Sequence, residues 1–462
     1  MENTMQFGQH ILQYQEDILR DIEQLVRIPS VAAVGGGEYP LGEQAAKALQ
    51  WILNRAQEMG LETVNTDNMA GHASYGEGDE VAAVLTHVDV VPAGDGWKTD
   101  PFTVLRQDGK LYGRGVADDK GPAVVALYCL KALKDAGVVG KRKIRAIFGA
   151  GEEINSDDIA HYLKTQPLPV MGFTPDADYG VCNREKGILR LKVSAPSHNG
   201  TTLTAMYGGT VVNAVPDKAV ALLDCTEQED HQLQRLADGR EGNFDFQYTI
   251  DGLKIVSYGK ASHAMHPQEG FNAATHLISL LAAGLGEAVL GSLCAFLDDA
   301  VGLECNGNSL GIAQSDEPSG ALTLNVGVVQ VGSEGASAGI DIRYPVTADG
   351  DAILEKIRAR AQKEGLTVEV ESHSKPLFVP DDSQLVQLLN QAYQSVTGQP
   401  AEVYATGGGT YARQLAGRGV AFGPFFKGEN PQYHNVGENI DIERFMQHAQ
   451  ICLEAMYRMF TA

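Results

Sequence analysis

The chain has few cysteines, no excess of positive charge and no long hydrophobic run. Its six cysteines, among 462 residues, show no C-x-x-C spacing, so we expect reduced, packed thiols rather than a disulfide framework. Lysine and arginine number 36 against 59 aspartates and glutamates, which gives a net charge of −23. This balance argues against a nucleic acid or an anionic membrane as partner, because both need a basic face.

Membrane-spanning and secretory signals are also lacking. The longest apolar stretches fall short of the ~18–20 residues that a membrane span needs. The segment MENTMQFGQHILQYQEDILRDI is acidic and has no unbroken apolar core, so we expect no signal peptide and a cytoplasmic protein. Apolar residues make up 44% of the chain, and its length predicts two or three folding units.

The first part of the chain, residues 1–188, shows the pattern of an α/β sheet. Apolar runs typical of buried strands lie at 81–89, 143–151 and 170–178. Helical patterns lie at 7–27, 42–59, 121–137 and 156–165. Alternation of strands and helices predicts a mainly parallel sheet covered by helices.

Residues 189–384 differ in character, with several β-like runs separated by a few helical patterns. We expect an inserted α+β domain there. Long helical patterns return at 383–398 and 441–460, so residues 385–462 are expected to rejoin the first sheet.

Polar clusters mark four segments of the first domain, each expected at the end of a strand. They are His87 with Asp89, Asp118 with Asp119, Glu152 with Glu153, and Asp176 with Asp178. Ligands of open α/β sheets bind beyond the carboxyl ends of the strands, so we expect these side chains to converge. So many anions need cations beside them, and imidazole with carboxylate suits zinc, or else manganese or cobalt. Each cluster alone would indicate a solvated loop with a capping aspartate, but four in succession favour a metal site.

The adjacent carboxylates of Glu152 and Glu153 suggest two different roles. Neighbouring side chains diverge on an extended backbone, so one can face a metal while the other faces a water molecule. His87 and Asp89 would instead share one face, which places Asp89 behind a metal-bound imidazole. The pattern H-x-D is a weak signal by itself.

Several motifs resemble, in order and spacing, those of the di-zinc metallopeptidases, a family that includes aminoacylases, carboxypeptidase G, desuccinylases and dipeptidases. They are THVDVVPAGDGW, LYGRGVADDKGP, GAGEEIN and FTPDADY. The resemblance continues through VVNAVP (211–216), GKASHAMHP (259–267), IDIRYP (340–345), TGGGTYAR (406–413) and YHNVGENI (433–440). It is greatest to the dipeptidase V branch of carnosinase-like Xaa-His dipeptidases, because GWKTDPF, GGGTYAR and the long insert are features of that branch.

This resemblance implies an α/β, mainly parallel-sheet di-metal catalytic domain, formed by residues 1–188 and 385–462, with residues 189–384 as an inserted α+β lid domain. It also implies two Zn²⁺ per chain, with Mn²⁺ or Co²⁺ possible. The implied metal ligands are His87 and Asp176 for one metal, Glu153 and His434 for the other, and Asp118 as the bridge.

The resemblance further implies catalytic roles for residues around the metals. Glu152 matches the general base, and Asp89 matches the carboxylate behind the first histidine. His263 and Asn213 match donors to the developing oxyanion, whereas His266 is expected to be an ordinary loop histidine.

Substrate-binding residues follow from the same motifs. Arg343 matches the residue that grips the substrate's C-terminal carboxylate, although the residue alone could be a surface ion-pair partner. The glycines of TGGGT would let backbone N–H groups approach that carboxylate; they are Gly407, Gly408 and Gly409.

The implied activity is hydrolysis of unmodified dipeptides by a metal-activated water. A long lid would enclose the site within one chain, so we expect an enzyme that is active as a monomer on small-molecule dipeptides, with no nucleic acid or membrane partner. The alternative with the same chemistry is an N-acyl amino-acid amidohydrolase of desuccinylase or aminoacylase type. A non-catalytic binding protein would require loss of a ligand or of the base, yet all are present. The segments PFFKGENPQYH and HNVGENI depart from the dipeptidase V pattern, which leaves side-chain preference open.

Overall fold

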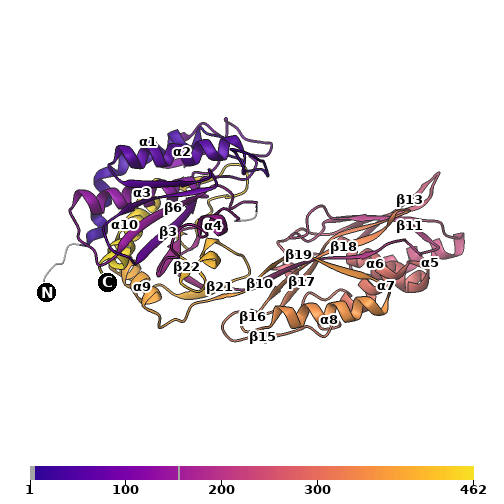
Figure 1. The fold of residues 1–462 in the computed structure, drawn as a ribbon. Coiled ribbons are helices and arrows are strands. Elements are labelled where there is room, and N and C mark those ends of the chain that lie inside the picture. Colours follow the sequence, from indigo (N-terminus) through magenta and orange to yellow (C-terminus); the bar gives the residue numbers. More distant parts are fainter. Residues whose placement is uncertain (1–5, 155–156) are drawn as a thin grey trace. The chain divides into compact units, whose positions relative to one another are not determined.

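The computed structural model describes residues 6–154 and 157–462 and divides into two compact units. Unit 1 comprises Met1–Arg184, Leu377–Ala405 and Gly409–Ala462. Unit 2 comprises Glu185–Pro376 and Thr406–Gly408 (Figure 1). Unit 2 is thus inserted in the chain between segments of unit 1, while the domain boundaries at 188/189 and 384/385 remain predictions.

A nine-stranded sheet forms the centre of unit 1, in the order β1-β2-β6-β3-β7-β22-β9-β20, with β21 (Val403–Thr406) paired to β9. Its four middle strands run parallel; they are β6 (Lys143–Gly149), β3 (Val81–His87), β7 (Met171–Thr174) and β22 (Gly419–Ala421). The flanking strands are β1 (Glu62–Thr66), β2 (Ala70–Tyr75), β9 (Val181–Glu185) and β20 (Leu377–Phe378). β1, β2 and β9 pair antiparallel, and the predicted mainly parallel α/β fold is confirmed.

Helices cover this sheet. They are η1 (Phe7–Tyr14), α1 (Gln15–Val26), α2 (Glu43–Glu58), α3 (Lys120–Asp135), α4 (Asp157–Tyr162), α9 (Gln384–Thr397), η5 (Tyr411–Leu415) and α10 (Ile442–Thr461). α3 is buried over nearly all of its surface, as its almost uniformly apolar sequence requires, and it packs against α1 and α10. Residues 155 and 156, the latter opening the helix expected at 156–165, lie outside the described residues.

The segment before Asp118 departs from the expected pattern. Its strand β5 (Lys110–Tyr112) belongs to a separate three-stranded sheet with β24 (Asn439–Asp441) and β4 (Leu105–Gln107). Asp118 is therefore carried by the turn over 113–119 that leads into α3, and not by the end of a strand of the main sheet.

The strand expected at 170–178 is also divided. β7 ends at Thr174, and the short β8 (Ala177–Asp178) pairs with β23 (Pro424–Phe425) instead of continuing in the main sheet. Pro175 lies between the two strands and has no backbone N–H to donate to a ladder.

Unit 2 contains an eight-stranded antiparallel sheet in the order β13-β14-β12-β11-β17-β18-β10-β19. Its strands are β10 (Gly187–Ala195), β11 (Leu203–Gly208), β12 (Lys218–Leu223), β13 (Asn243–Thr249), β14 (Gly252–Tyr258), β17 (Thr323–Gly332), β18 (Gly335–Tyr344) and β19 (Thr367–Ser374). Its α-helices are α5 (Glu227–Asp238), α6 (Ala273–Leu285), α7 (Ser292–Phe296) and α8 (Gly350–Lys363), which lie along one face of the sheet (Figure 1). Short helical turns are η2 (Pro267–Glu269), η3 (Glu287–Val289) and η4 (Leu297–Val301). Side chains alternate along β10, with Leu189, Leu191 and Val193 in the core.

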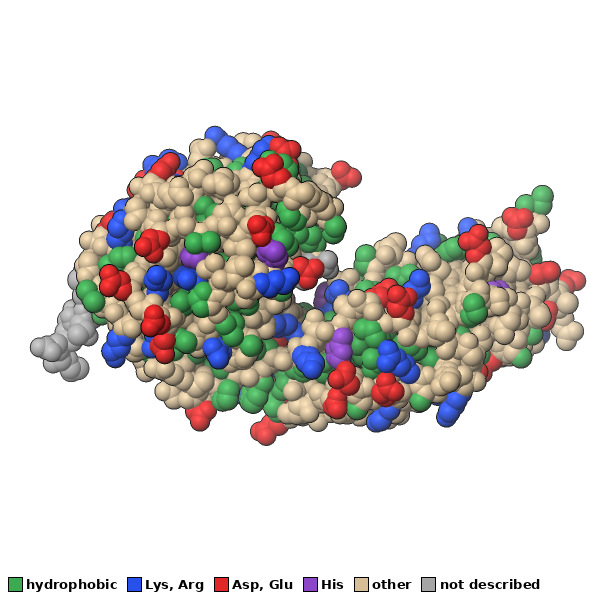
Figure 2. Space-filling model, viewed as in Figure 1, with side chains coloured by type: hydrophobic (Ala, Val, Ile, Leu, Met, Phe, Trp, Pro, Cys, Tyr) green, Lys and Arg blue, Asp and Glu red, His purple; other side chains and the backbone are tan. Residues whose placement is uncertain are grey.

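Charged side chains of both signs are interspersed on the face of the molecule seen in Figure 2. Within residues 6–154 and 157–462, no helix combines the length and the apolar character that crossing a membrane requires.

Candidate metal centre

His87 ends β3 and is buried, with its two ring nitrogens engaged on opposite sides. Nε2 lies 3.0 Å from Oδ1 of Asp118, and Nδ1 lies 3.1 Å from the backbone carbonyl oxygen of Asp89. The carbonyl can only accept a hydrogen bond, so Nδ1 carries a proton and Nε2 can act as a ligand. This is the usual arrangement of a metal-binding histidine, whose second nitrogen donates to an oxygen.

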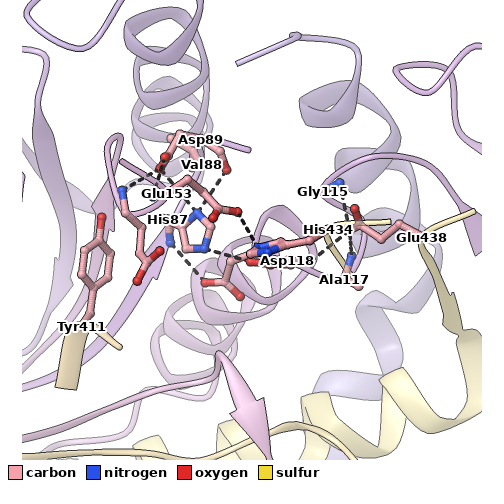
Figure 3. A network of polar contacts seen from close by, with 12 residues as sticks. His87, Val88, Asp89, Gly115, Ala117, Asp118, Glu153, Tyr411, His434 and Glu438 are labelled. Carbon is pink, nitrogen blue, oxygen red and sulfur yellow. Dashed lines mark hydrogen bonds and ion pairs between the residues drawn. The ribbon is translucent and has the colours of Figure 1, made fainter. Parts of the chain in front are cut away.

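Asp118 connects two histidines that lie far apart in the sequence. Its Oδ1 faces His87, while its Oδ2 lies 2.9 Å from Nε2 of His434 (Figure 3). The same Nε2 lies 3.2 Å from Oε1 of Glu153. Donor atoms bound tetrahedrally at zinc distances stand about 3.3 Å apart, so these separations suit ligands that share a metal. One oxygen toward each imidazole is the arrangement of a bridging carboxylate.

Asp176 and Glu152 lie on the His87 side of the cluster. Ligand atoms of His87, Glu152 and Asp176 all lie within 4.8 Å of one another, as do those of His87, Asp118 and Glu153. The structure thus brings together all five predicted ligands and the predicted base. Glu152 stands as close to His87 and Asp176 as a ligand would, and its assignment as the base remains a prediction.

The electrostatics of the cluster favour a cation. Burial raises the pKa of Asp176 well above its usual range, and the neighbouring charge of Asp118 raises it further. Burial does the same for Glu152, followed by the charge of Asp176. Hydrogen bonds to Asp118 and Glu153 raise the pKa of His434 to about 11. A divalent cation would relieve this excess of negative charge, so the residues present fit a metal.

Asp89 has a wider role than the sequence suggested. Its carboxylate accepts hydrogen bonds from the backbone N–H groups of Glu152 and Glu153, at 3.2 and 3.1 Å (Figure 3). Oδ1 of Asp89 lies 3.4 Å from Nδ1 of His87, whereas the backbone carbonyl oxygen of Asp89 lies 3.1 Å from the same nitrogen. The carboxylate of Asp89 therefore holds the adjacent glutamates, in addition to lying behind the histidine.

Sequence reasoning missed Asp158, a second buried acid that holds the same loop. Its Oδ2 accepts hydrogen bonds from the backbone N–H groups of Ala150 and Gly151, and from the hydroxyl of Tyr411. The ring of Tyr411 stands edge-on to the His87 ring, with centroids 6.2 Å apart. Tyr411 lies in the motif TGGGTYAR, whereas Asp158 resembles an ordinary acid in the first turn of a helix.

Two further acids from the polar clusters have different positions. Asp119 follows Asp118 through a cis peptide bond, and its Oδ2 accepts a hydrogen bond from the backbone N–H of His87 at 3.1 Å. Asp178 is exposed on β8, and its carbonyl oxygen accepts a hydrogen bond from the hydroxyl of Tyr404. In the part of the chain that the structure describes, neither residue belongs to a potential metal-binding group.

Arg343 of unit 2 is buried on β18 and is held by a strand neighbour. Its Nε and Nη2 donate to the two oxygens of Asp341, and its Nη1 donates to the carbonyl oxygen of Gly407 at 2.8 Å. Three of the five N–H groups are then used, which leaves one on each terminal nitrogen. These two hydrogens can still meet both oxygens of one carboxylate.

Asn213 and His263 lie side by side in unit 2. An isolated β-bridge joins Ala214 to His263, and the backbone N–H of Ala264 donates to the carbonyl of Asn213 at 2.9 Å. The N–H of Met265 donates to Nδ1 of His263, which leaves the proton of the neutral ring on Nε2. Burial and the charge of Arg343 lower the pKa of His263, so the ring is neutral at pH 7 and has an N–H to donate.

His266 belongs to the loop after His263, as expected. Its backbone N–H donates to the carbonyl of His263, and its own carbonyl accepts from the hydroxyl of Ser262.

Two of the three glycines of TGGGT, Gly407 and Gly409, lie close to neighbouring side chains. A Cβ atom on Gly407 would lie 2.7 Å from Cβ of Met265, so no larger residue fits there without movement. The N–H of Gly408 donates to Oγ1 of Thr406 at 3.0 Å. A Cβ atom on Gly409 would lie 2.8 Å from Nε of Arg413 in unit 1. Binding of a substrate carboxylate by Gly407, Gly408 and Gly409 remains a prediction.

The chain forms two units, with the histidine–carboxylate cluster in unit 1, and comparison with known proteins shows its family. Residues 83–458 match the model of peptidase family M20/M25/M40, and the chain belongs to that family. The protein is therefore a peptide-bond hydrolase, and the family expected from the motifs is confirmed.

Similar proteins span the chain almost completely. The Bacillus subtilis (strain 168) protein named "Putative dipeptidase YtjP" is 34% identical over 98% of this chain and 100% of its own length. "Putative dipeptidase SSP1012" of Staphylococcus saprophyticus is 32% identical over 97% of this chain and 98% of its own. The crystal structure of human carnosine dipeptidase 1 shares the fold with a TM-score of 0.61, at 13% identity and 98% coverage of both chains.

Proposed function

We propose that the protein is a metal-dependent dipeptidase that hydrolyses unmodified dipeptides with two Zn²⁺ per chain. The observation that carries this proposal is the bridging position of Asp118 between His87 and His434. The two relatives described above match this chain over nearly their whole length and carry the name dipeptidase, which supports the substrate class.

The metal ligands follow from the cluster. His87 and Asp176 would hold one ion, Glu153 and His434 the other, and Asp118 both. Two such ions, when bound, would lower the pKa of a water molecule and polarise the carbonyl group of the scissile bond. Manganese or cobalt would bind the same oxygen and nitrogen donors.

Glu152 is proposed to move the proton. It takes a proton from the attacking water on a carboxylate oxygen and delivers it to the leaving amine. Asp89 holds the backbone N–H groups of both Glu152 and Glu153, and the carboxylate of Glu153 faces His434. Burial favours the protonated form of Glu152 after the first transfer, which helps it to act next as an acid.

Residues of unit 2 are assigned to the same reaction by the resemblance of their motifs. His263, with a proton on Nε2, and Asn213 donate to the oxyanion that develops on the scissile carbonyl. Arg343 offers two parallel N–H groups to the C-terminal carboxylate of the substrate. We further propose that the enzyme acts as a monomer in the cytoplasm, without a nucleic acid or membrane partner.

A substrate panel tests the proposal. Purified protein is treated with EDTA, divided, and reconstituted with Zn²⁺, Mn²⁺ or Co²⁺ before assay on dipeptides, tripeptides and N-acyl amino acids. We expect EDTA to abolish hydrolysis, a divalent metal to restore it, and dipeptides to be cleaved best. Hydrolysis that resists chelation would refute the metal-dependent mechanism. Preference for N-acyl amino acids would instead identify an amidohydrolase.

A further inference from the structure

Glu438 is a completely buried acid that the proposed reaction does not use. It lies four residues beyond His434, in the turn that leads to β24. A buried carboxylate is costly unless hydrogen bonds and counter-charges compensate for lost hydration, so its partners identify its role.

The partners of Glu438 belong to one short turn, that over residues 113–118. Its Oε1 accepts hydrogen bonds from three backbone N–H groups, those of Gly115 (2.9 Å), Ala117 (2.9 Å) and Asp118 (3.2 Å) (Figure 3). Its Oε2 accepts from Nη1 of Arg114 at 2.6 Å, and its carbonyl oxygen accepts from the N–H of Gly113 at 3.1 Å. Glu438 thus accepts hydrogen bonds from four of the six backbone N–H groups of the turn that carries Asp118, three through its carboxylate and one through its carbonyl oxygen.

Arg114 anchors this arrangement to a third segment. Its Nη2 reaches the carbonyl oxygens of Pro92 and Ala93 at 3.4 and 3.3 Å, and its guanidinium lies over the ring of Trp97, 5.5 Å from the centroid. The segment 92–97 begins a few residues after His87. The contacts of Glu438 and Arg114 therefore link three segments: the loop that carries His434, the turn that carries Asp118 and the segment that follows His87.

We propose, on the basis of the proposed metal-dependent function, that Glu438 is a positioning residue that fixes Asp118 relative to His434 and so sets the affinity of the site for metal. Asp118 must present one oxygen to each histidine, and a shift of its backbone would misdirect both oxygens. Glu438 prevents this shift because it holds the N–H of Asp118 itself and the turn just before it, from the same loop as His434.

Glu438→Gln is an informative substitution because it preserves shape while removing one acceptor. The amide oxygen can serve either the three backbone N–H groups or Arg114, and the amide NH₂ then faces donors on the other side. Losses of 10–100-fold in metal affinity are typical when a partner of a metal-binding group is removed. We expect a loss of about this size for Glu438→Gln.

Glu454→Gln provides a matched control in the same unit. Glu454 is also buried, and it also accepts hydrogen bonds from a backbone N–H, that of Gly8, and from a guanidinium, that of Arg458. It lies on α10, away from the turn over 113–118. Glu454→Gln is expected to destabilise the fold similarly and to leave metal affinity unchanged.

The experiment is a Zn²⁺ titration of metal-free protein in competition with a chromophoric chelator, with circular dichroism as the measure of folding. A folded Glu438→Gln variant with reduced affinity, beside an unchanged Glu454→Gln, supports the proposal. Equal affinity in wild type and Glu438→Gln, or equal loss in both variants, overturns it. Should Glu438→Gln not fold, Glu438→Asp keeps the charge, and wild-type affinity in that shortened side chain would also overturn the proposal. Absence of tight Zn²⁺ binding by wild type would instead refute the proposed function.

Discussion

Nε2 of His434 lies 2.9 Å from Oδ2 of Asp118, although the two residues come from the last and the first of the three sequence segments of unit 1. His434 has a positive φ of 60°, a backbone conformation that residues other than glycine adopt uncommonly. Such residues persist where surrounding contacts require them, which agrees with a functional constraint on this histidine.

The bridging role of Asp118 predicts the metal content of a variant. Asp118→Asn replaces one of the two oxygens by an NH₂ group that cannot ligate, so at least one of two metals should be lost from the purified protein. Metal analysis after dialysis measures this. Asp178→Asn, which alters an exposed acid outside the potential metal-binding groups, should keep the wild-type content. Full metal content in Asp118→Asn would contradict the bridge.

Glu152 and Glu153 should respond differently to the same substitution. Glu152→Gln removes the proposed base, so turnover should fall by about 10²–10⁴-fold while the metal remains bound. Glu153→Gln removes a ligand beside His434, so the metal content itself should fall. Steady-state kinetics with a dipeptide and metal analysis of both variants separate the roles. Near-normal turnover by Glu152→Gln would exclude it as the base.

Arg343 should discriminate substrates by their C-terminal group. Arg343→Lys supplies a single ammonium where two parallel N–H groups were available, so KM for dipeptides should rise by about 10-fold or more. The corresponding dipeptide amides, which have no carboxylate, should change little. Arg360→Lys, a charged residue paired with Asp299 and Glu364 on unit 2, serves as the control. A similar rise in KM for acids and amides would argue against carboxylate binding.

A buried histidine away from the metal centre predicts sensitivity to acid. Burial lowers the pKa of His448 to about 3, and its Nδ1 pairs with the hydroxyl of Tyr179. The unfolded chain takes up the proton near pH 6.5, so this contribution to stability is complete above pH 6.5 and is lost as pH falls toward 3. At pH 5 the loss is about 2 kcal/mol.

Denaturant unfolding of metal-free protein at pH 7 and pH 5 tests this contribution. His448→Phe should be less stable than wild type at pH 7, since Tyr179 loses its partner. Between pH 7 and pH 5, however, its free energy of unfolding should fall by about 2 kcal/mol less than that of wild type. His231→Phe, on the exposed surface of α5, should behave like wild type. If the free energy of unfolding fell equally between pH 7 and pH 5 in wild type and His448→Phe, His448 would not couple folding to proton binding.

Local sequence patterns predicted the α/β fold class and the closeness of the candidate ligands. Apolar runs located β3 and β6, and the polar residues that follow them met at one edge of the sheet, because parallel strands present the same ends together. The expectation that Asp118 ends a strand of the main sheet is wrong. The strand before it, β5, pairs with β4 and β24 in a separate sheet, and this pairing depends on contacts between distant segments.

The acids that hold the site in place could not be predicted in the same way. Glu438 and Asp158 act on backbone N–H groups, which every residue possesses, so no residue type marks their partners in the sequence. Asp341 is different, because it precedes Arg343 by two positions on an expected strand and therefore shares its face. That spacing was a usable signal for the ion pair that orients Arg343.

The discontinuity of unit 1 has a consequence for biosynthesis. Unit 2 is nearly continuous in sequence, from Glu185 to Pro376. The ribosome therefore makes it after the segment that carries His87, Asp118, Glu153 and Asp176. The segment that carries His434 and Glu438 is made last. A nascent or truncated chain that ends within unit 2 carries the acidic half of the cluster with a single imidazole. If the proposed metal-dependent function holds, the full set of candidate ligands would form only once the last part of unit 1 has docked, and metal uptake would then report this docking.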